Sequence, residues 1–421
     1  MSNTKNPTSF TGYQKAVIFL LAVVSFTIVL DFMVMAPLGD MLMKTMNLNA
    51  TQFASAVSAY AFSAGISGLL AAGFADRFDR KKLLLFFYAG FIIGTFLCGI
   101  ASSYQLLLLG RIVTGLFGGV LGSISMAIIT DLFSFEQRGR VMGYVQMAFA
   151  VSQVAGIPIG LFLANKMGWE APFFLIVFLS VLTALSILKF IKPVSAHIGA
   201  AGRTNPFRHL QKTVSKPSYI LPFITTAMLS IGGFMMMPFS TPFVINNLQI
   251  SQHDLPLIYI VTGIGSMIIL PLIGKLSDKI GKFPTFIMGT VLAIVMVVIF
   301  THLKPLPIWE LMIVNTVMFA GIMSRMIPSQ ALMTAIPNIE DRGAFMSINS
   351  SLQQVAGGVA SVIAGMIIVQ QANHKLLHFD TLGFVVIAVM ILCCFMMYAI
   401  SKRVAKKVHA PKEVMAVEMS A

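Results

Sequence analysis

Residues 104–130 read YQLLLLGRIVTGLFGGVLGSISMAIIT and contain a single charged side chain, Arg111. A hydrocarbon core of about 30 Å is crossed by roughly 20 helical residues, whereas the helices of soluble proteins rarely exceed about 20 residues. The length of this almost uncharged stretch therefore predicts a helix that crosses a membrane.

Comparable apolar stretches follow one another along the whole chain. The hydrophobic set makes up 57% of the 421 residues and charged residues only 10%, against about 25% charged residues in soluble domains. We therefore expect an all-α membrane protein with 12 transmembrane helices. The other predicted spans are 16–42, 51–74, 83–101, 141–164, 171–191, 217–246, 254–276, 284–302, 307–333, 343–370 and 380–402.

The longest polar stretch between spans, residues 192–216, divides them into two sets of six. We expect an N-terminal six-helix bundle at 1–191, a cytoplasmic linker at 192–216, a C-terminal six-helix bundle at 217–402 and a cytoplasmic tail at 403–421. The apolar run from about Ala16 exceeds a signal-peptide core and lacks a small-residue cleavage site, so it is expected to be a retained first helix.

Short motifs recur in the second half at a spacing of about 200 residues, and parallel six-helix repeats with a substrate site between them are a known transporter architecture. The repeats predict two pseudo-symmetric bundles. The paired motifs are Asp76-Arg77 with Asp278-Lys279, Glu136-Gln137-Arg138-Gly139 with Glu340-Asp341-Arg342-Gly343, and Gln153-Val154-Ala155-Gly156 with Gln354-Val355-Ala356-Gly357.

Lys and Arg residues predict the orientation, because cytoplasmic loops hold their excess. With the N-terminus inside, the outer loops hold only Lys44, Lys166, Lys304 and Lys375. Both termini are then cytoplasmic, in a bacterial-type inner (plasma) membrane. The formal net charge of +14 is spread between apolar runs, so it does not indicate a nucleic-acid partner.

The sequence shows no motif that is typical of an enzyme active site. Cys98, Cys393 and Cys394 all fall in apolar runs, so neither a disulfide framework nor a zinc site is predicted. No phosphate-binding loop and no carboxylate pair for hydrolysis is found. We expect no enzymatic activity, no metal and no cofactor.

The loop after the second span resembles the first signature of the major facilitator superfamily, Gly-x-x-x-Asp-Arg/Lys-x-Gly-Arg/Lys-Arg/Lys. Ala72 and Asp79 depart from it at the two Gly positions, and the second copy, from Gly274 to Lys282, fits better. The resemblance covers nearly the whole chain and implies a latch between the cytoplasmic ends of the halves; alternatively, the basic residues only enforce topology. The expected latch residues are Asp76, Arg77, Arg80, Lys81, Asp278, Lys279 and Lys282.

Arg111, followed by Gly115, is similar to the intramembrane arginine motif of the same family. A charge inside the membrane needs a partner or water. Asp31 in the first span lies at about the same depth, at 1.5 Å rise per residue. We therefore expect Asp31 and Arg111 to form a functional ion pair across the cavity of the first half, or else a structural ion pair.

Asp31 and Pro37 in the first span resemble a motif of drug:proton antiporters. A desolvated carboxylate holds its proton more readily, and a nearby guanidinium opposes this, so the chemistry suits proton coupling. The alternative is an Asp31 that stays in one protonation state.

Gly156, Pro158 and Gly160 in the fifth span resemble a variant Gly-Pro signature found in sugar-efflux and purine-efflux relatives. Gly and Pro in a spanning helix allow close helix approach and a bend. The resemblance implies export.

Arg325 is a second intramembrane cation with no evident acidic partner in the sequence. It is expected either to bind an anionic substrate group or to cap backbone carbonyls. Polar residues within the spans are also expected to line a substrate cavity, or else to form hydrogen bonds between helices. These residues are Gln146, Gln153, Asn315, Gln330, Asn349 and Gln353, with Gln354 beside them.

The chain contains 29 methionines, three of them consecutive at Met235, Met236 and Met237. Flexible thioether side chains suit a binding surface that repacks around varied apolar ligands. Alternatively, these methionines only contact lipid.

These patterns predict a secondary active transporter, an antiporter that exports a small amphipathic or hydrophobic compound in exchange for protons by alternating access. The alternatives are proton-coupled uptake or facilitated transport of a sugar, purine or organic anion, and lipid handling or sensing on the same scaffold. The expected partners are a small-molecule substrate, protons and membrane lipids, and the protein is expected to be a monomer.

Overall fold

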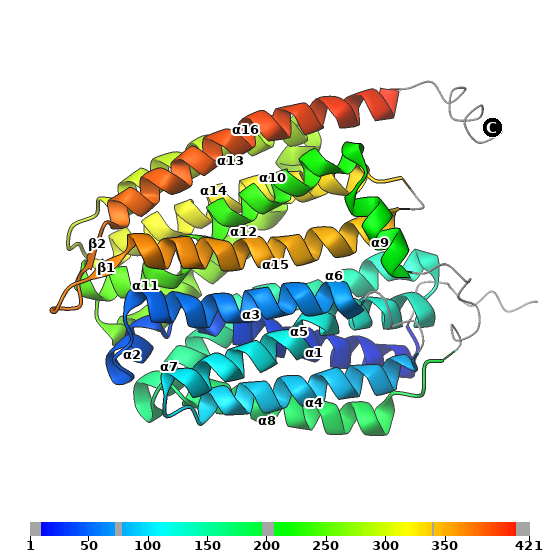
Figure 1. Cartoon of the computed structure of the whole chain (residues 1–421), viewed down its shortest axis with the longest axis horizontal. Coiled ribbons are helices and arrows are strands. Elements are labelled where there is room, and N and C mark those ends of the chain that lie inside the picture. The colour runs from blue at the N-terminus through cyan, green and yellow to red at the C-terminus, as the bar shows by residue number, and fades with distance from the viewer. Residues whose placement is uncertain (1–9, 72–77, 196–205, 339–340, 410–421) are drawn as a thin grey trace, which may run out of the picture.

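The computed structural model describes residues 10–71, 78–195, 206–338 and 341–409. Its long helices run nearly parallel or antiparallel to one another along the long axis of the molecule (Figure 1). The elements are α1 (Gly12–Val34), α2 (Gly39–Thr45), α3 (Ala50–Ala71), α4 (Arg80–Gly99), α5 (Tyr104–Leu132), α6 (Phe135–Val151), η2 (Ser152–Gly156), α7 (Ile157–Met167), α8 (Ala171–Phe190), α9 (Pro206–Val214), α10 (Pro217–Phe234), α11 (Met237–Asn246), η3 (Gln252–Asp254), α12 (Leu255–Ile280), α13 (Lys282–Thr301), α14 (Ile308–Ala335), α15 (Arg342–Ile367), β1 (Val369–Gln370), β2 (Leu376–Leu377) and α16 (Phe379–His409).

The described residues contain twelve helical segments long and apolar enough to cross a membrane, as predicted. Large apolar side chains such as Phe86, Phe178 and Phe395 are more than half exposed on the outer helix surfaces. A soluble protein rarely exposes so much contiguous apolar surface, whereas a bilayer accommodates it. The chain is an all-α integral membrane protein.

The first predicted span, 16–42, is divided in the structure. α1 ends at Val34, a turn contains Pro37, and α2 begins at Gly39. Proline disfavours helical geometry in the residue before it, and its ring clashes with the preceding helical turn. This explains why the apolar run continues while the helix stops.

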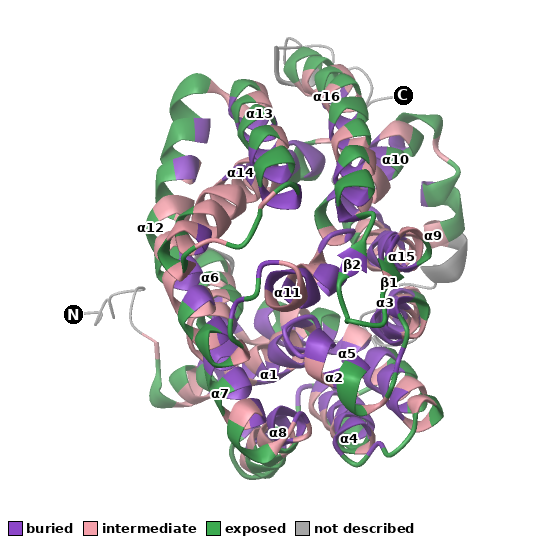
Figure 2. Ribbon diagram, turned by 90° about the vertical axis from the view of Figure 1, so that its left-hand side faces the viewer, coloured by how far each residue is buried: buried purple, intermediate pink, exposed green. Residues whose placement is uncertain are grey.

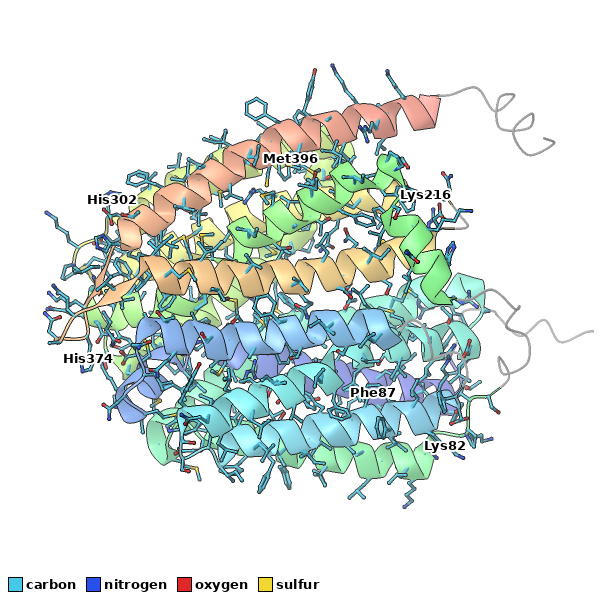
Figure 3. All side chains as sticks on the ribbon, in the orientation of Figure 1. Lys82, Phe87, Lys216, His302, His374 and Met396 are labelled. Atoms are coloured by element: carbon cyan, nitrogen blue, oxygen red, sulfur yellow. The ribbon has the colours of Figure 1, made fainter. Side chains whose placement is uncertain are left out.

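The two ends of the molecule differ. One end, the linker end, holds α9 and the first residues of α1; the other, the hairpin end, holds α2 and the antiparallel pair β1–β2 (Figure 1). Figure 3 labels Lys82 and Lys216 at the linker end, and His302 and His374 at the hairpin end. The helix α9 inside the predicted linker and the β1–β2 pair were not predicted.

We propose to keep the predicted division, with a first half of α1–α8 and a second half of α10–α16. The halves meet mainly where α3 packs against α15 and where α12 packs against η2 and α7. Viewed onto the hairpin end, α11 lies near the centre of the molecule, and exposed residues lie mostly on the outer faces of the helices (Figure 2). The interface between the halves therefore runs through the middle of the molecule.

Candidate functional site

A cavity of about 550 Å³ lies between the two halves. Ligand sites of small molecules occupy about 300–1,000 Å³, so the volume suits a small organic compound. The first half contributes α1, α6, η2 and α7, and the second half contributes α10 through α16. Most of the wall therefore belongs to the second half.

The lining is apolar with scattered polar groups. Nine of its described residues are methionines and five are phenylalanines. Met236 and Met237 of the predicted triplet are among them, while Met235 is buried outside the lining. The methionines are Met33, Met236, Met237, Met318, Met323, Met326, Met333, Met346 and Met390, and the phenylalanines are Phe32, Phe149, Phe234, Phe300 and Phe319.

Most of the polar residues suggested by the sequence line this cavity: Gln153, Asn315, Arg325, Gln330, Asn349 and Gln353. Gln146 does not. Its spacing places it on the same face of α6 as Phe149, but it lies one turn nearer the linker end, is exposed, and is not part of the described lining. Gln354 lines a separate small pocket.

The cavity is closed at the hairpin end and opens toward the linker end. Lining residues near the hairpin end, such as Val244 and Phe300, are 7% and 1% exposed, whereas Met346 near the linker end is 37% exposed and Thr334 is also exposed.

A three-residue cluster joins the two halves at the closed end. Asn246 of α11 donates through Nδ2 to Asp40 Oδ1 at 2.5 Å, and Lys44 donates through Nζ to Asp40 Oδ2 at 2.9 Å and to Asn246 Oδ1 at 3.0 Å. Asp40 is only 1% exposed. The sequence pattern does not single out these residues, because nothing in it relates α2 to α11.

Arg325 lies on α14 and is 3% exposed. Its Nε donates to Thr290 Oγ1 on α13 at 3.2 Å, and its guanidinium carbon lies 5.6 Å from the centre of the Phe286 ring. Its Nη2 is buried and has no hydrogen-bond partner among the described residues. No backbone carbonyl accepts from it within the described chain, so the carbonyl-capping alternative is not realised there.

Asp31 and Arg111 form an ion pair in which Arg111 Nη1 donates to Asp31 Oδ2 at 2.8 Å. Thr95 Oγ1 on α4 donates to the other carboxylate oxygen at 3.2 Å. Both charged side chains are 0% exposed, and neither is among the described residues that line the cavity. The pair is thus packed between α1, α4 and α5, not set across an open cavity as expected.

Two aromatic side chains separate this ion pair from the cavity. The guanidinium of Arg111 lies over the Tyr60 ring, 4.6 Å from its centre. Tyr60 contacts Phe32 at a centroid distance of 5.4 Å, and Phe32 lines the cavity and contacts Phe234 of the second half at 6.0 Å. Tyr60 and Phe32 therefore connect the ion pair to the cavity and, through Phe234, to the second half.

The predicted bend motif coincides with an irregular turn. A π-helical segment, η2, ends at Gly156, and α7 begins directly after it with Pro158 in its first turn. A π turn accommodates the missing N–H and the bulk of proline. Here α12 approaches closely, because a Cβ on Gly263 would lie 2.7 Å from Val154 Cγ2.

Four described members of the predicted latch, Arg80, Lys81, Asp278 and Lys282, have contacts within their own half. Arg80 pairs with Asp131 at 3.3 Å, and Lys81 donates to the carbonyl of Leu188. Asp278, near the end of α12, pairs with Lys282, the first residue of α13, at 2.5 Å. Lys279 is exposed, and Asp76 and Arg77 lie outside the described residues.

A second cluster of hydrogen-bonded side chains lies at the linker end and was not predicted from the sequence. Asp341, directly before α15, accepts from Lys216 Nζ at 2.5 Å and from the Tyr219 hydroxyl at 2.8 Å, and His209 of α9 lies 3.9 Å away. Burial raises the pKa of Asp341, but the hydrogen bonds from Lys216 and Tyr219 and the charge of Lys216 outweigh it, so the pKa lies below its usual value. The cluster ties the linker helix to the second half.

Curated proteins resemble this chain in sequence. An uncharacterized MFS-type transporter, YceJ, of Bacillus subtilis (strain 168) is 30% identical over 278 residues, 65% of this chain and 70% of that protein. Multidrug resistance protein 2 of the same strain is 25% identical, over 64% and 68% of the two chains. A probable sugar efflux transporter of Helicobacter pylori (strain G27) is 23% identical, over 66% and 71%.

Solved structures share the fold. A bacterial homologue of the human lysosomal transporter Spinster, in an inward-facing and occupied conformation, aligns with a TM-score of 0.74 at 15% identity over 94% of this chain and 98% of that one. The nucleoside transporter NupG aligns with a TM-score of 0.73 at 13% identity, over 91% and 99%. The sequence model of the Major Facilitator Superfamily matches residues 21–361 and, in a second match, 223–417. The chain thus belongs to the Major Facilitator Superfamily, whose members are membrane transporters and not enzymes.

Proposed function

We propose that the protein exports a small amphipathic or hydrophobic compound in exchange for protons, by alternating access between its two halves. The observation that carries the proposal is the cavity of about 550 Å³ between the halves, with its Met- and Phe-rich wall. The names of two relatives, a multidrug resistance protein and a probable sugar efflux transporter, support export.

The orientation follows from the distribution of Lys and Arg. With both termini in the cytoplasm, the linker end faces the cytoplasm and the cavity is open to it. An exporter of this kind loads its compound from the cytoplasm or the inner leaflet. We propose that it works as a monomer in the inner membrane.

Proton coupling is assigned to Asp31 and Arg111. Ionised together, they form a neutral pair in a buried environment; protonation of Asp31 removes the charge-assisted bond, worth about twice a neutral one, and leaves Arg111 without a counter-ion. Tyr60 and Phe32 transmit that change to the cavity. Each inward proton supplies about 2.3 kcal/mol per 100 mV of membrane potential, which suffices to concentrate a solute.

The test uses everted vesicles that overproduce the protein and accumulate the fluorescent compounds N-phenyl-1-naphthylamine and 8-anilinonaphthalene-1-sulfonate. We expect wild-type vesicles to accumulate at least one of them when acidified inside, because export is then directed into the vesicle. Asp31→Asn should abolish this accumulation. Thr95→Val removes only the hydrogen bond that an uncharged hydroxyl donates to Asp31, and this variant should retain most of the accumulation.

The double variant Asp31→Asn with Arg111→Gln removes both charges and controls for misfolding caused by an unpaired Arg111. It should assemble and bind, yet remain unable to use the proton gradient. Uphill, pH-dependent accumulation by Asp31→Asn would show that Asp31 is not the coupling residue, and accumulation only in right-side-out vesicles would replace export by uptake.

A further inference from the structure

The charges in the cavity wall are unbalanced. Among the described lining residues Arg325 is the only charged one, and the wall contains no Asp, Glu, Lys or His in the described part of the chain. A lipophilic cation entering this space would meet a positive charge and no carboxylate. An anion would meet a cation in an otherwise apolar surrounding, where charge interactions are strong.

Arg111 and Arg325, the two buried arginines of the described chain that lie away from the ends of their helices, have different surroundings. Arg111 is neutralised by Asp31 at 2.8 Å, whereas no described acidic side chain forms an ion pair with Arg325. Buried charges in proteins are paired as a rule. A buried cation that lines a ligand-sized cavity without a counter-ion is therefore incomplete until an anion binds.

The surroundings of Arg325 hold its guanidinium in place without satisfying it. The Thr290 hydroxyl donates to the Phe286 carbonyl at 2.8 Å, so its oxygen presents a lone pair to Arg325 Nε at 3.2 Å. The Phe286 ring lies beside the guanidinium at 5.6 Å. One edge of the fork is thus anchored on α13, while Nη2 has no acceptor among the described residues. Guanidinium groups bind carboxylate, sulfonate and phosphate oxygens in pairs.

We propose that Arg325 binds the acidic head group of the transported compound, and that the substrate class is the monoanionic amphiphile, with an apolar body packed among the methionines and phenylalanines of the wall. This deepens the proposed function by naming the charge of its substrate, and it rests on the cavity being the transport site. It sets the protein apart from exporters of lipophilic cations.

The test measures binding, which requires neither a proton gradient nor transport. Purified protein in nanodiscs of phosphatidylcholine, free of anionic lipid, is titrated with two probes that share one skeleton. 8-Anilinonaphthalene-1-sulfonate carries a single negative charge, and N-phenyl-1-naphthylamine lacks the sulfonate. We expect the anion to bind at least about tenfold tighter than its neutral counterpart after subtraction of empty nanodiscs, a factor equal to about 1.4 kcal/mol.

Substitutions of Arg325 test whether this residue causes the preference for the anionic probe. Arg325→Gln should abolish the preference for the anion while keeping the affinity for the neutral probe, which also shows that the variant is folded. Arg325→Lys keeps the charge and should keep part of the preference. Arg342→Gln makes the same substitution at an exposed position at the start of α15 and should behave like wild type.

Equal binding of the two probes by wild type, or an unchanged preference in Arg325→Gln, would overturn the proposal. Displacement of the sulfonate probe by millimolar inorganic phosphate would also overturn it, because a site for free phosphate does not need the apolar body. These outcomes are separate from failure of the proposed function: a protein that prefers the anion through Arg325 but never accumulates it against a gradient would refute proton-coupled export alone.

Discussion

At the scale of single residues, Asp341 offers a test of how the linker helix is held. Its carboxylate receives bonds from Lys216 and Tyr219 at the linker end. Bonds to charged groups contribute about 1.5–3 kcal/mol, so Asp341→Asn should lower the melting temperature at neutral pH and increase hydrogen exchange in α9.

The pH dependence of that effect follows from the lowered pKa of Asp341. Its stabilisation is fully present above the unfolded value of about 3.9 and is lost as pH falls through the lower folded-state value. In a His209→Gln background, which removes the imidazole 3.9 Å away, the difference in melting temperature should stay constant from pH 8 to pH 5. If the difference in melting temperature vanished by pH 5.5, a titratable group other than Asp341 would be responsible for the stabilisation.

Single residues also show how far sequence reasoning reaches. Asp31 and Arg111 could be related because two long spans fix their depths, and the structure places them 2.8 Å apart. Their complete burial could not be foreseen, since depth along a helix does not say which face meets a cavity. Asp40 and Asn246 lie at span ends in different halves, where no depth argument connects them.

At the scale of elements, the contact of α12 with η2 depends on Gly263. An added Cβ would lie 2.7 Å from Val154 Cγ2 and 3.0 Å from Val154 Cα. Gly263→Ala gains up to about 1 kcal/mol of helix propensity, but overpacking costs about 1–3 kcal/mol. Gly274 on the same helix has nothing within 4 Å of such a Cβ. Gly274→Ala should therefore gain helix propensity without the cost of overpacking.

In detergent, the melting temperature of Gly274→Ala should therefore be higher than that of Gly263→Ala. The melting temperature of the wild type should lie between the two or close to that of Gly274→Ala. Adding Val154→Ala to Gly263→Ala should recover part of the loss. Equal stability of the two single variants would mean that the halves are not packed tightly at this turn.

Long elements were predictable and short ones were not. The twelve spans follow from run length alone, because a bilayer requires about 20 apolar residues in each. α2 continues the apolar run of the first span, and α9 and β1–β2 are too short to impose a period on the sequence, so none of them was expected. The cavity residues were partly predictable, since polar side chains within spans are few.

At the scale of the whole molecule, the closed hairpin end is held by Asn246 bridging to Asp40 and Lys44. Asn246→Ala removes this link between the halves and leaves the Asp40–Lys44 pair intact within α2. We expect the population to shift toward conformers open at the hairpin end, so that a cysteine placed at Val244 in a cysteine-free background reacts roughly tenfold faster with a membrane-impermeant maleimide, for a loss of about 1.4 kcal/mol.

Asn247→Ala is the matched control. Asn247 also makes two side-chain hydrogen bonds, but both go to Leu376 within the second half. Its substitution should leave the labelling rate at Val244 nearly unchanged. Acceleration of similar size in both variants would mean that local loosening, and not separation of the halves, exposes the site.

The nine methionine thioethers that the described residues contribute to the cavity wall can be oxidised. Peroxide or hypochlorite converts a methionine that it reaches into a sulfoxide, which is polar and chiral. A cavity wall that accommodates apolar ligands would then become polar, and enzymatic reduction of the sulfoxides would be needed to restore transport. A cell under oxidative attack would thus lose transport through this protein without any change in its genes.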